Sequence, residues 1–331
     1  MKYRTLTGTG LKISRFSLGT MMFGGQTSEA ESLEMIRYAI DNGITSIDTA
    51  DMYNLGVTEE IVGKAIAGIR DKVVLATKLG GRMSDDPNDA GLSRHHVIKA
   101  CDDSLRRLGT DYIDIYYLHF PDYSTPLAET LEATTQLVRD GKVRYVAVSN
   151  FASWQVVQCQ WLAEKHHFTA PACNQVVYNL LQRDIEGELL ACLKTQKVGL
   201  TIYNPLAGGM LTGKHKRGEP QGDNRFNTSQ GSGGRTLGEV YYERYWTEAI
   251  FDAVDKFAEI AAGAGISLTE LAIRWCISQN QIDSILIGAS RTSQLAENIT
   301  HLDKPILSQD ILTACDNVYA ELQGVTFKYN R

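Results

Sequence analysis

The sequence has few cysteines, few prolines and no long hydrophobic run. Its six cysteines are dispersed over 331 residues, and no two of them form C-x-x-C. This pattern disfavours a disulfide framework, and we expect reduced thiols in a cytoplasmic protein. No stretch approaches the roughly 18 consecutive apolar residues of a membrane-spanning helix. The first residues lack the apolar region of a secretory signal, so we expect no such signal.

An excess of positive charge is also missing. Lys and Arg number 33 against 39 Asp and Glu, which gives a net charge of −6. Without a basic block, the chain is a poor candidate for binding nucleic acid or an anionic membrane surface. Hydrophobic residues make up 43% and charged residues 22%, as in folded globular proteins. The composition therefore predicts a soluble, intracellular globular protein.

Short apolar runs alternate with longer amphipathic segments along the chain. The expected strands are residues 16–18, 46–48, 73–77, 113–118, 143–148, 172–175, 200–203 and 284–287. The expected helices are residues 30–42, 59–66, 94–108, 127–140, 154–165, 186–195, 246–262, 268–279 and 295–301. Gly43, Gly109 and Gly141 each follow a helical pattern, as is typical of helix ends.

Strands that alternate with helices indicate parallel β-α-β units. Two α/β architectures fit this order, a doubly wound open sheet and a closed (β/α)8 TIM barrel of about 250 residues with additions. Eight strands and a uniform composition favour the barrel. Residues 1–15 predict an N-terminal β-hairpin, and residues 309–323 predict an added C-terminal helix. We expect a single domain over residues 1–331.

Residues 214–235 depart from this pattern. The segment is polar and contains Gly218, Pro220, Gly222, Gly231, Gly233 and Gly234. A long loop inside a compact domain is usually a lid or a mobile insertion. Because it follows the seventh expected strand, we predict a mobile loop on the face where a barrel holds its site.

Functional side chains of such barrels project from the C-terminal ends of the strands. The polar residues at these positions are Asp48, Lys78, His119, Ser149, Asn150, Gln175, Tyr203 and Asn204, with residues 288–291 after the last strand. Any one of them can be an ordinary solvated strand end. An Asp, a Lys and a His at one barrel mouth are harder to dismiss, because an ion pair held in a partly dry cleft indicates a function.

Tyr53 lies five residues after Asp48. A Lys about 4 Å from a phenol oxygen stabilises the phenolate by about 4 kcal/mol at an effective dielectric of about 20. Lys78 would thereby make Tyr53 a usable general acid near neutral pH. Asp48 would keep Lys78 charged and aimed, and His119 would hydrogen-bond the substrate oxygen. The set suits a reaction that places negative charge on a carbonyl oxygen, such as hydride addition.

Several spaced motifs resemble those of the aldo-keto reductase superfamily, including its branch of voltage-gated potassium channel β subunits. They are residues 43–50 (GITSIDTA) with Tyr53, 77–78 (TK), 118–119 (LH), 141–144 (GKVR), 148–151 (VSNF), 174–175 (NQ) with 178–179 (YN), 203–209 (YNPLAGG) with 211–214 (LTGK), and 287–291 (IGASR) with 294–295 (QL) and 297–298 (EN). Their order makes the resemblance specific, and it covers essentially the whole chain.

The resemblance implies a catalytic tetrad of Asp48, Tyr53, Lys78 and His119, with Tyr53 as the proton donor. It implies NADPH as cofactor, with Ser149, Asn150 and Gln175 on the nicotinamide carboxamide and Tyr203 stacked on its ring. Leu206 and Lys214 would lie at the pyrophosphate, with Asn204 and Gly208 as further contacts, and Gly288, Ser290, Arg291, Gln294, Glu297 and Asn298 would surround the adenosine phosphate and adenine.

Arg291 favours NADPH over NADH, because a guanidinium matches a 2′-phosphate bidentately. Gln294 stands where some branches place a second Arg, so we expect only moderate selectivity for this phosphate. Asn54 directly follows Tyr53, where many relatives have Gly, and we expect it to alter the loop more than the chemistry. Met22, Phe23 and Tyr123 lie on loops at the mouth and are candidates for the substrate pocket, or else ordinary packing residues.

Other motifs do not indicate a site. Gly8-x-Gly10 does not follow a strand and has Ile13 at the sixth position, so it is no dinucleotide fingerprint. The adjacent histidines at 95–96 and 166–167 diverge by about 100° on a helix, so we expect no metal site. Trp154 and Trp161, seven residues apart on an expected helix, predict core packing.

The sequence thus predicts an NADPH-dependent oxidoreductase that reduces an aldehyde or ketone to an alcohol, with Tyr53 as general acid. Its partner would be a small carbonyl compound, including sugars, and the protein a monomer or homo-oligomer. The alternative is a cofactor-sensing regulatory subunit resembling the channel β proteins, although His119 stands where that branch carries another residue. An aldolase with Lys78 as Schiff-base lysine fits less well, because a charged Lys paired with Asp48 is a poor nucleophile.

Overall fold

The computed structural model describes residues 2–218, 220, 222, 224–228, 231–232 and 235–324. The chain divides into two compact units. The first comprises Met1–Val177, Asp184–Tyr203 and Gln281–Ile299, and the second comprises Tyr178–Arg183, Asn204–Asn280 and Thr300–Arg331. The single domain stays a prediction. So does the mobile loop over 214–235, of which residues 219, 221, 223, 229–230 and 233–234 lie outside the described ones.

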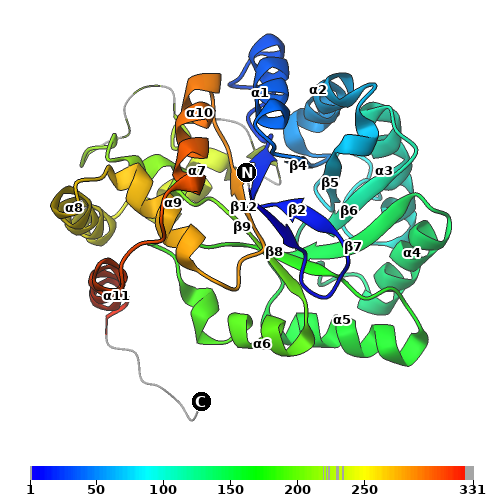
Figure 1. Ribbon diagram of the computed structural model, residues 1–331. Helices are drawn as coiled ribbons and strands as arrows, with labels where there is room; N and C mark the ends of the chain where they lie inside the picture. Colours follow the sequence, from blue (N-terminus) through cyan, green and yellow to red (C-terminus); the bar gives the residue numbers. More distant parts are fainter. Residues whose placement is uncertain are drawn as a thin grey trace. The chain divides into compact units, whose positions relative to one another are not determined.

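The first unit contains a closed barrel of eight parallel strands (Figure 1). The strands are β3 (Phe16–Gly19), β4 (Ser46–Asp48), β5 (Val74–Leu79), β6 (Ile113–Leu118), β7 (Val143–Ser149), β8 (Cys173–Val177), β9 (Gly199–Tyr203) and β12 (Ser284–Ile287). The last strand, β12, pairs with the first, β3, with Ile285 opposite Phe16. This closure confirms the predicted TIM barrel and excludes the open sheet.

Helices follow the barrel strands and surround them (Figure 1). They are α1 (Glu29–Asp41), α2 (Val57–Ile66), α3 (Arg94–Leu108), α4 (Leu127–Arg139), α5 (Ser153–His166), α6 (Leu189–Gln196) and α10 (Thr292–Thr300), with short 3-10 turns η1 (Tyr53–Gly56), η2 (Arg70–Lys72) and η3 (Asp184–Gly187). The ends of α3 show why the sequence defined it well. The Ser93 hydroxyl caps its first turn by accepting from the His96 N–H, and Gly109 ends it at a φ of 62°.

The predicted N-terminal hairpin is present, as antiparallel β1 (Tyr3–Thr5) and β2 (Lys12–Ser14). It lies at the end of the barrel where the strands begin, because the Ser46 N–H donates to the Ser14 hydroxyl across 3.1 Å. Leu6 and Ile13 pack there against a buried cluster that includes Ile115 and Tyr117. With this end filled, the opposite, C-terminal end of the strands remains for a site.

The second unit is helical. It contains α7 (Leu237–Tyr245), α8 (Glu248–Gly263), α9 (Leu268–Ser278), α11 (Gln309–Gln323), the turns η4 (Ala207–Thr212) and η5 (His301–Asp303), and the ladder of β10 (Gly231–Ser232) and β11 (Arg235–Thr236). The predicted C-terminal helix is confirmed as α11, which packs against α8. Among the described residues, no single helix is long and apolar enough to cross a membrane. Only α8 and α9 taken together, across an 89° bend, pass by length and composition.

Helix α5 corrects the prediction for the two tryptophans. Trp154 and Trp161 are 60% and 54% exposed, so they do not pack in the core. The helix is apolar on more than one face, and the apolar side chains it buries are Val156, Cys159, Leu162 and Ala163. A seven-residue spacing places two side chains on one face but does not say which face is buried.

All six cysteines lie in the described part of the chain, and all are free thiols. Burial raises the pKa of both Cys101 and Cys159 to about 12. These thiols are therefore protonated and poorly nucleophilic at neutral pH.

Candidate active site

Asp48, Lys78 and Tyr53 form one hydrogen-bonded group at the mouth of the barrel. The Lys78 ammonium donates to Oδ1 of Asp48, to the Thr49 carbonyl across 2.8 Å, and to the Tyr53 hydroxyl across 3.3 Å. These three acceptors match the three donors of an ammonium group. Lys78 is fully buried and Asp48 is 3% exposed, so this ion pair is shielded from water.

Strand pairing explains how two residues 30 positions apart in sequence meet. Strands β4 and β5 are parallel, and Asp48 is opposite Ala76. Lys78 lies two residues beyond Ala76, and side chains two apart on a strand share a face. Asp48 and Lys78 therefore project from the same face at adjacent strand ends.

Lys78 remains positively charged. Burial by itself would lower the pKa of Lys78, but the Asp48 carboxylate, with its charge and hydrogen bond, raises this pKa above its ordinary value. The ammonium also lies 5.0 Å from the centre of the Tyr53 ring. A lysine held as the cation is a poor nucleophile, which argues against the Schiff-base alternative.

His119 completes the predicted tetrad at the end of β6. Its ring meets the Tyr53 ring edge-on, with centroids 5.9 Å apart at 76°, and stacks on Phe120 at 5.4 Å. Burial and the neighbouring charge of Lys78 lower the pKa of His119 well below its usual value. The imidazole is therefore neutral at physiological pH, and a neutral imidazole can donate one hydrogen bond and accept another.

The turn after Tyr53 explains the unusual Asn54. Asn54, Leu55 and Gly56 have φ of 47°, 51° and 94°, in the left-handed region that glycine favours. Asn adopts this conformation more readily than most residues. The Asn54 side chain also donates to the Phe23 carbonyl across 2.7 Å. Asn54 thus keeps a glycine-like backbone and ties the turn that carries Tyr53 to a neighbouring loop.

The three pocket candidates differ in exposure. Met22 and Phe23 are buried, at 7% and 0%, whereas Tyr123 is 83% exposed. Phe23 therefore presents no side-chain surface to solvent. Leu55 and Phe120, which the sequence analysis did not single out, are exposed beside Tyr53 and His119 in the chain. Adjacency to the tetrad was the available signal for both.

The four residues predicted at the nicotinamide meet at the ends of β7, β8 and β9. The Ser149 hydroxyl donates to the Gln175 carbonyl across 2.8 Å. The Tyr203 hydroxyl donates to Oδ1 of Asn150 across 2.9 Å, and Nδ2 of Asn150 donates to the His119 carbonyl across 3.1 Å. These contacts join the cluster to the tetrad. A second link runs from Nε2 of Gln175 to Oδ2 of Asp48, at 2.8 Å.

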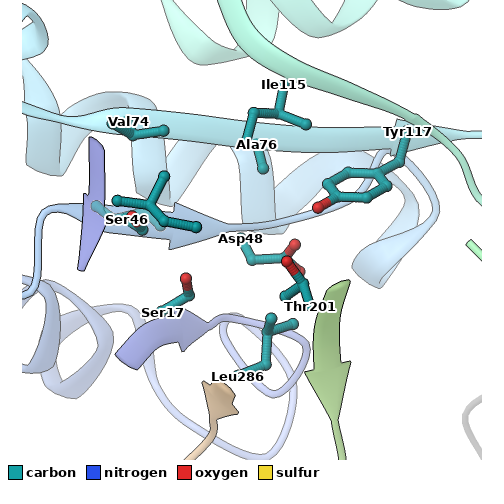
Figure 2. Close-up of a pocket in the computed structure, with 11 residues that line it drawn as sticks. Ser17, Ser46, Asp48, Val74, Ala76, Ile115, Tyr117, Thr201 and Leu286 are labelled. Carbon is teal, nitrogen blue, oxygen red and sulfur yellow. The ribbon is translucent and has the colours of Figure 1, made fainter. Parts of the chain in front are cut away.

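A small cavity lies inside the barrel. Figure 2 shows Asp48 and Tyr117 among the side chains at this cavity, together with Ser17, Ser46 and Thr201. Its lining includes neither Tyr53 nor His119. The cavity therefore belongs to the barrel interior.

The residues predicted around the adenosine end follow β12 and continue into α10. They are Gly288, Ser290, Arg291, Gln294, Glu297 and Asn298. Oε1 of Gln294 accepts from the Ser290 N–H and hydroxyl, each across 3.1 Å.

Glu31 of α1 reaches the same segment. It accepts from the Thr292 N–H across 2.6 Å and from the Thr292 hydroxyl across 2.8 Å. These hydrogen bonds, with a smaller contribution from the charge of Arg291, lower the pKa of Glu31. The sequence analysis missed Glu31, because nothing local links α1 to a segment about 260 residues away.

Within the second unit, Asn204, Leu206 and Gly208 build a tight turn. Oδ1 of Asn204 accepts from the Gly208 N–H across 2.6 Å, and the Leu206 carbonyl accepts from the Gly209 N–H across 2.8 Å. Gly209 has a φ of 106°, and a Cβ there would lie 3.0 Å from Cε of Lys214. Lys214 therefore lies directly against a turn that only glycine accommodates well.

Lys214 has a second cation nearby. Burial lowers the pKa of Lys214, and the charge of Arg225 lowers it further. Arg225 in turn donates to the Tyr241 hydroxyl across 3.1 Å. Two neighbouring cations beside a glycine turn are a donor set that suits phosphate oxygens. The sequence analysis missed Arg225, because it lies in the polar segment that was interpreted only as a loop.

Comparison with known proteins identifies the family of this chain. The Aldo/keto reductase family model matches residues 15–320. The chain is 35% identical to an aldo-keto reductase of Bacillus subtilis (strain 168), over 99% of this chain and 97% of the relative. It is 34% identical to the L-glyceraldehyde 3-phosphate reductase of Escherichia coli O157:H7, over 97% and 93%. It is 33% identical to a protein of Oryza sativa subsp. japonica named "Probable voltage-gated potassium channel subunit beta", over 98% and 97%. The chain belongs to the aldo/keto reductase family.

Proposed function

We propose that this protein is an NADPH-dependent reductase of small aldehydes or ketones, in which Tyr53 is the general acid. The observation that carries the proposal is the buried Lys78 ammonium, which donates both to Asp48 and to the Tyr53 hydroxyl. Membership of the family supports carbonyl reduction by an oxidoreductase, because its members use nicotinamide cofactors and act on small carbonyl compounds.

A reduced nicotinamide, when bound, would supply the hydride for the carbonyl carbon. Tyr53 hydrogen-bonds the substrate carbonyl oxygen and gives it a proton as negative charge develops there. The adjacent Lys78 ammonium stabilises the phenolate that Tyr53 becomes. Asp48 keeps Lys78 charged and aimed, so the proton donor is prepared before the substrate arrives.

His119 has the separate task of orienting the substrate. Its low pKa leaves the imidazole uncharged, so it does not add a second cation beside Lys78. A neutral imidazole donating to the carbonyl oxygen would fix the substrate in front of the Tyr53 hydroxyl.

The cofactor residues remain a proposal, and the donor sets fit the group. Ser149, Asn150 and Gln175 offer hydroxyl and amide groups for a carboxamide, and Tyr203 offers a ring for stacking. The remaining candidates are Lys214 with Arg225, Asn204, Leu206 and Gly208 for phosphate oxygens, and Arg291 with Gly288, Ser290, Gln294, Glu297 and Asn298 for the adenosine end.

The test is NADPH oxidation by the isolated chain with a panel of aldehydes, ketones and sugars, together with NADPH binding measured by fluorescence. We expect turnover by the wild type and a loss of kcat of about 10²–10⁴-fold in Tyr53→Phe. NADPH affinity in this variant should stay unchanged. No NADPH binding at micromolar concentration, or full activity of Tyr53→Phe, would contradict the proposal.

A second candidate function is a cofactor-sensing regulatory subunit. It is favoured by relatives from Oryza sativa and Arabidopsis thaliana whose names are channel subunit beta, at 33% and 34% identity over 98% and 96% of this chain. NADPH binding without turnover on any carbonyl compound would favour this role. Rapid multiple turnover by the isolated chain would argue against a purely regulatory one.

A further inference from the structure

Gln175 crosses the interior of the barrel. Counted around the closed sheet, β8 and β4 are four strands apart in both directions, so they lie on opposite walls. Gln175 of β8 nevertheless reaches Asp48 of β4, with Nε2 2.8 Å from Oδ2. The Gln175 side chain is buried at 3% exposure. Its backbone is fixed on β8 by pairing with Ser149 of β7 and Thr201 of β9.

This contact gives Asp48 a donor for each carboxylate oxygen. Oδ1 accepts from Lys78, and Oδ2 accepts from Gln175. Lys78 then donates onward to Tyr53. A buried carboxylate depends strongly on such donors, because water cannot replace them.

We propose that Gln175 is a positioning residue that orients Asp48 and thereby, through Lys78, sets the acidity of Tyr53. This role is additional to any contact with the cofactor. Its catalytic meaning rests on the proposed function, but the effect on Tyr53 belongs to the cofactor-free protein as well.

The amide orientation makes both roles compatible. An ionised carboxylate only accepts hydrogen bonds, so the NH₂ group of Gln175 must face Asp48. The amide oxygen, on the other branch of the side chain, is then available as an acceptor. A nicotinamide carboxamide offers a matching NH₂ group, so one side chain can contact both the cofactor and Asp48.

Gln175 acts on the charges of the Asp48–Lys78 pair, because the other titratable side chains nearby are neutral. Among the described residues, the other titratable side chains facing this pair, besides Tyr53, are Tyr117 of β6, His119 at its end, and Cys173 of β8 behind Tyr117. Burial raises the pKa of Tyr117 well above its usual value and that of Cys173 to about 12. Burial lowers the pKa of His119, so all three are neutral near pH 7.

The direction of the effect follows from charge. The Gln175 N–H disperses part of the negative charge of Asp48. Without this donor, more negative charge acts on Lys78 and Tyr53, and the Tyr53 phenolate becomes less favourable. Loss of the Gln175 donor should therefore make Tyr53 a weaker acid.

The decisive test is an NMR titration of Tyr53 in the cofactor-free protein. Tyrosine labelled with ¹³C at Cζ reports the ionisation, and Tyr53→Phe identifies the Tyr53 signal. We expect Gln175→Met, which keeps side-chain length but removes the donor, to raise the titration midpoint by about 0.5–1 pH unit. Gln160→Met in α5, the same change at a glutamine outside the site, is the matched control. Nε2 of Gln160 donates to the Pro171 carbonyl across 3.1 Å, outside the tetrad and the proposed cofactor residues, so loss of that donor should not move the Tyr53 midpoint.

A second variant and a kinetic readout complete the test. Gln175→Glu adds a carboxyl group beside Asp48 and should raise the midpoint further once it ionises. In reduction assays, Gln175→Met should lower kcat at saturating NADPH by about 3–10-fold and move the basic limb of the pH profile upward. Gln160→Met should leave both kcat and the pH profile unchanged.

The outcomes separate the two proposals. An unchanged Tyr53 midpoint in both folded Gln175 variants would overturn the positioning role, even if NADPH affinity falls. A raised midpoint in the Gln175 variants, together with a wild type that never oxidises NADPH, would overturn the proposed function but keep the role of Gln175.

Discussion

The backbone N–H of Asp51 donates to the backbone carbonyl of Lys78 across 3.0 Å. Asp51 thus continues the pairing of β4 with β5 beyond Asp48, two residues before Tyr53. Its carboxyl group is fully buried, and no side chain of the described residues hydrogen-bonds either of its oxygens. Burial and the nearby Glu59 carboxylate raise the pKa of Asp51 well above its usual value.

The first prediction concerns Asp51 and pH. Because the folded pKa is raised, the folded protein binds more protons than the unfolded chain above the unfolded value of about 3.9. The free energy of unfolding therefore decreases as pH rises from about 4 toward the folded pKa. Asp51→Asn removes this loss, so its stability relative to the wild type should increase with pH. Urea unfolding at a series of pH values measures this difference in the free energy of unfolding between Asp51→Asn and the wild type. Asp85→Asn, at an exposed position, is the control, and parallel curves for Asp51→Asn and wild type would contradict the prediction.

The second prediction separates charge pairing from catalysis. Lys78→Met leaves the buried Asp48 carboxylate without its cation, and we expect a loss of about 3–5 kcal/mol in the free energy of unfolding. The double variant Asp48→Asn/Lys78→Met removes the unpaired charge and should recover a large part of that stability. Neither variant should reduce carbonyl compounds, because both lack Lys78. Equal stability of the single and double variants in urea would contradict the prediction.

The third prediction concerns cofactor preference. Glu31 places a carboxylate at the first turn of α10, close to the charge of Arg291. Replacing it by Gln removes a negative charge that opposes a 2′-phosphate. Glu31→Gln should increase the preference for NADPH over NADH by about 3–10-fold, measured as the ratio of dissociation constants. Glu34→Gln, an exposed change on the same helix, controls for net charge. A preference that shifts equally in both variants would assign the effect to overall charge.

The fourth prediction concerns the turn within the second unit. The Tyr245 hydroxyl accepts from Asn204 across 2.9 Å and donates to Gln182 across 3.0 Å, and Asn204 in turn holds the Gly208 N–H. Tyr245→Phe removes one hydrogen-bond partner from the side-chain amides of Asn204 and Gln182. NADPH affinity should fall by about 5–20-fold, with a smaller change in kcat. Tyr242→Phe is the comparison, because the Tyr242 ring stacks on Trp246 and is partly exposed. Unchanged NADPH affinity in Tyr245→Phe would show that this turn does not contribute to cofactor binding.

The barrel was predictable because its signals are local. Strands β6 and β12 and helices α3 and α11 have the expected bounds. Each is a short apolar run or an amphipathic stretch that ends at a recognisable cap or turn. The strand-end positions of Asp48, Lys78 and His119 follow directly from those runs. Tyr53 was predicted from its chemistry, because a nearby Lys stabilises the phenolate and so makes the phenol a stronger acid.

Contacts between distant segments were not predictable. The hydrogen bond from Gln175 to Asp48 joins residues 127 positions apart, and it exists only because the sheet closes. Helix α7 was also missed, because it follows a segment rich in Gly that predicts only a loop. The exposed faces of Trp154 and Trp161 depend on which side of α5 meets the barrel, which periodicity alone does not determine.

Closure of the barrel by its first and last strands has a consequence for biosynthesis. The hydroxyls of Ser17 and Ser284 lie 2.7 Å apart, although 267 positions separate them in the chain. A ribosome adding about 5–20 residues per second needs roughly 15–50 seconds to make the intervening segment. Throughout that interval β3 has an open edge, which another nascent chain can pair with. We expect the newly made protein to rely on chaperones until β12 has emerged, and to aggregate when translation stalls before it.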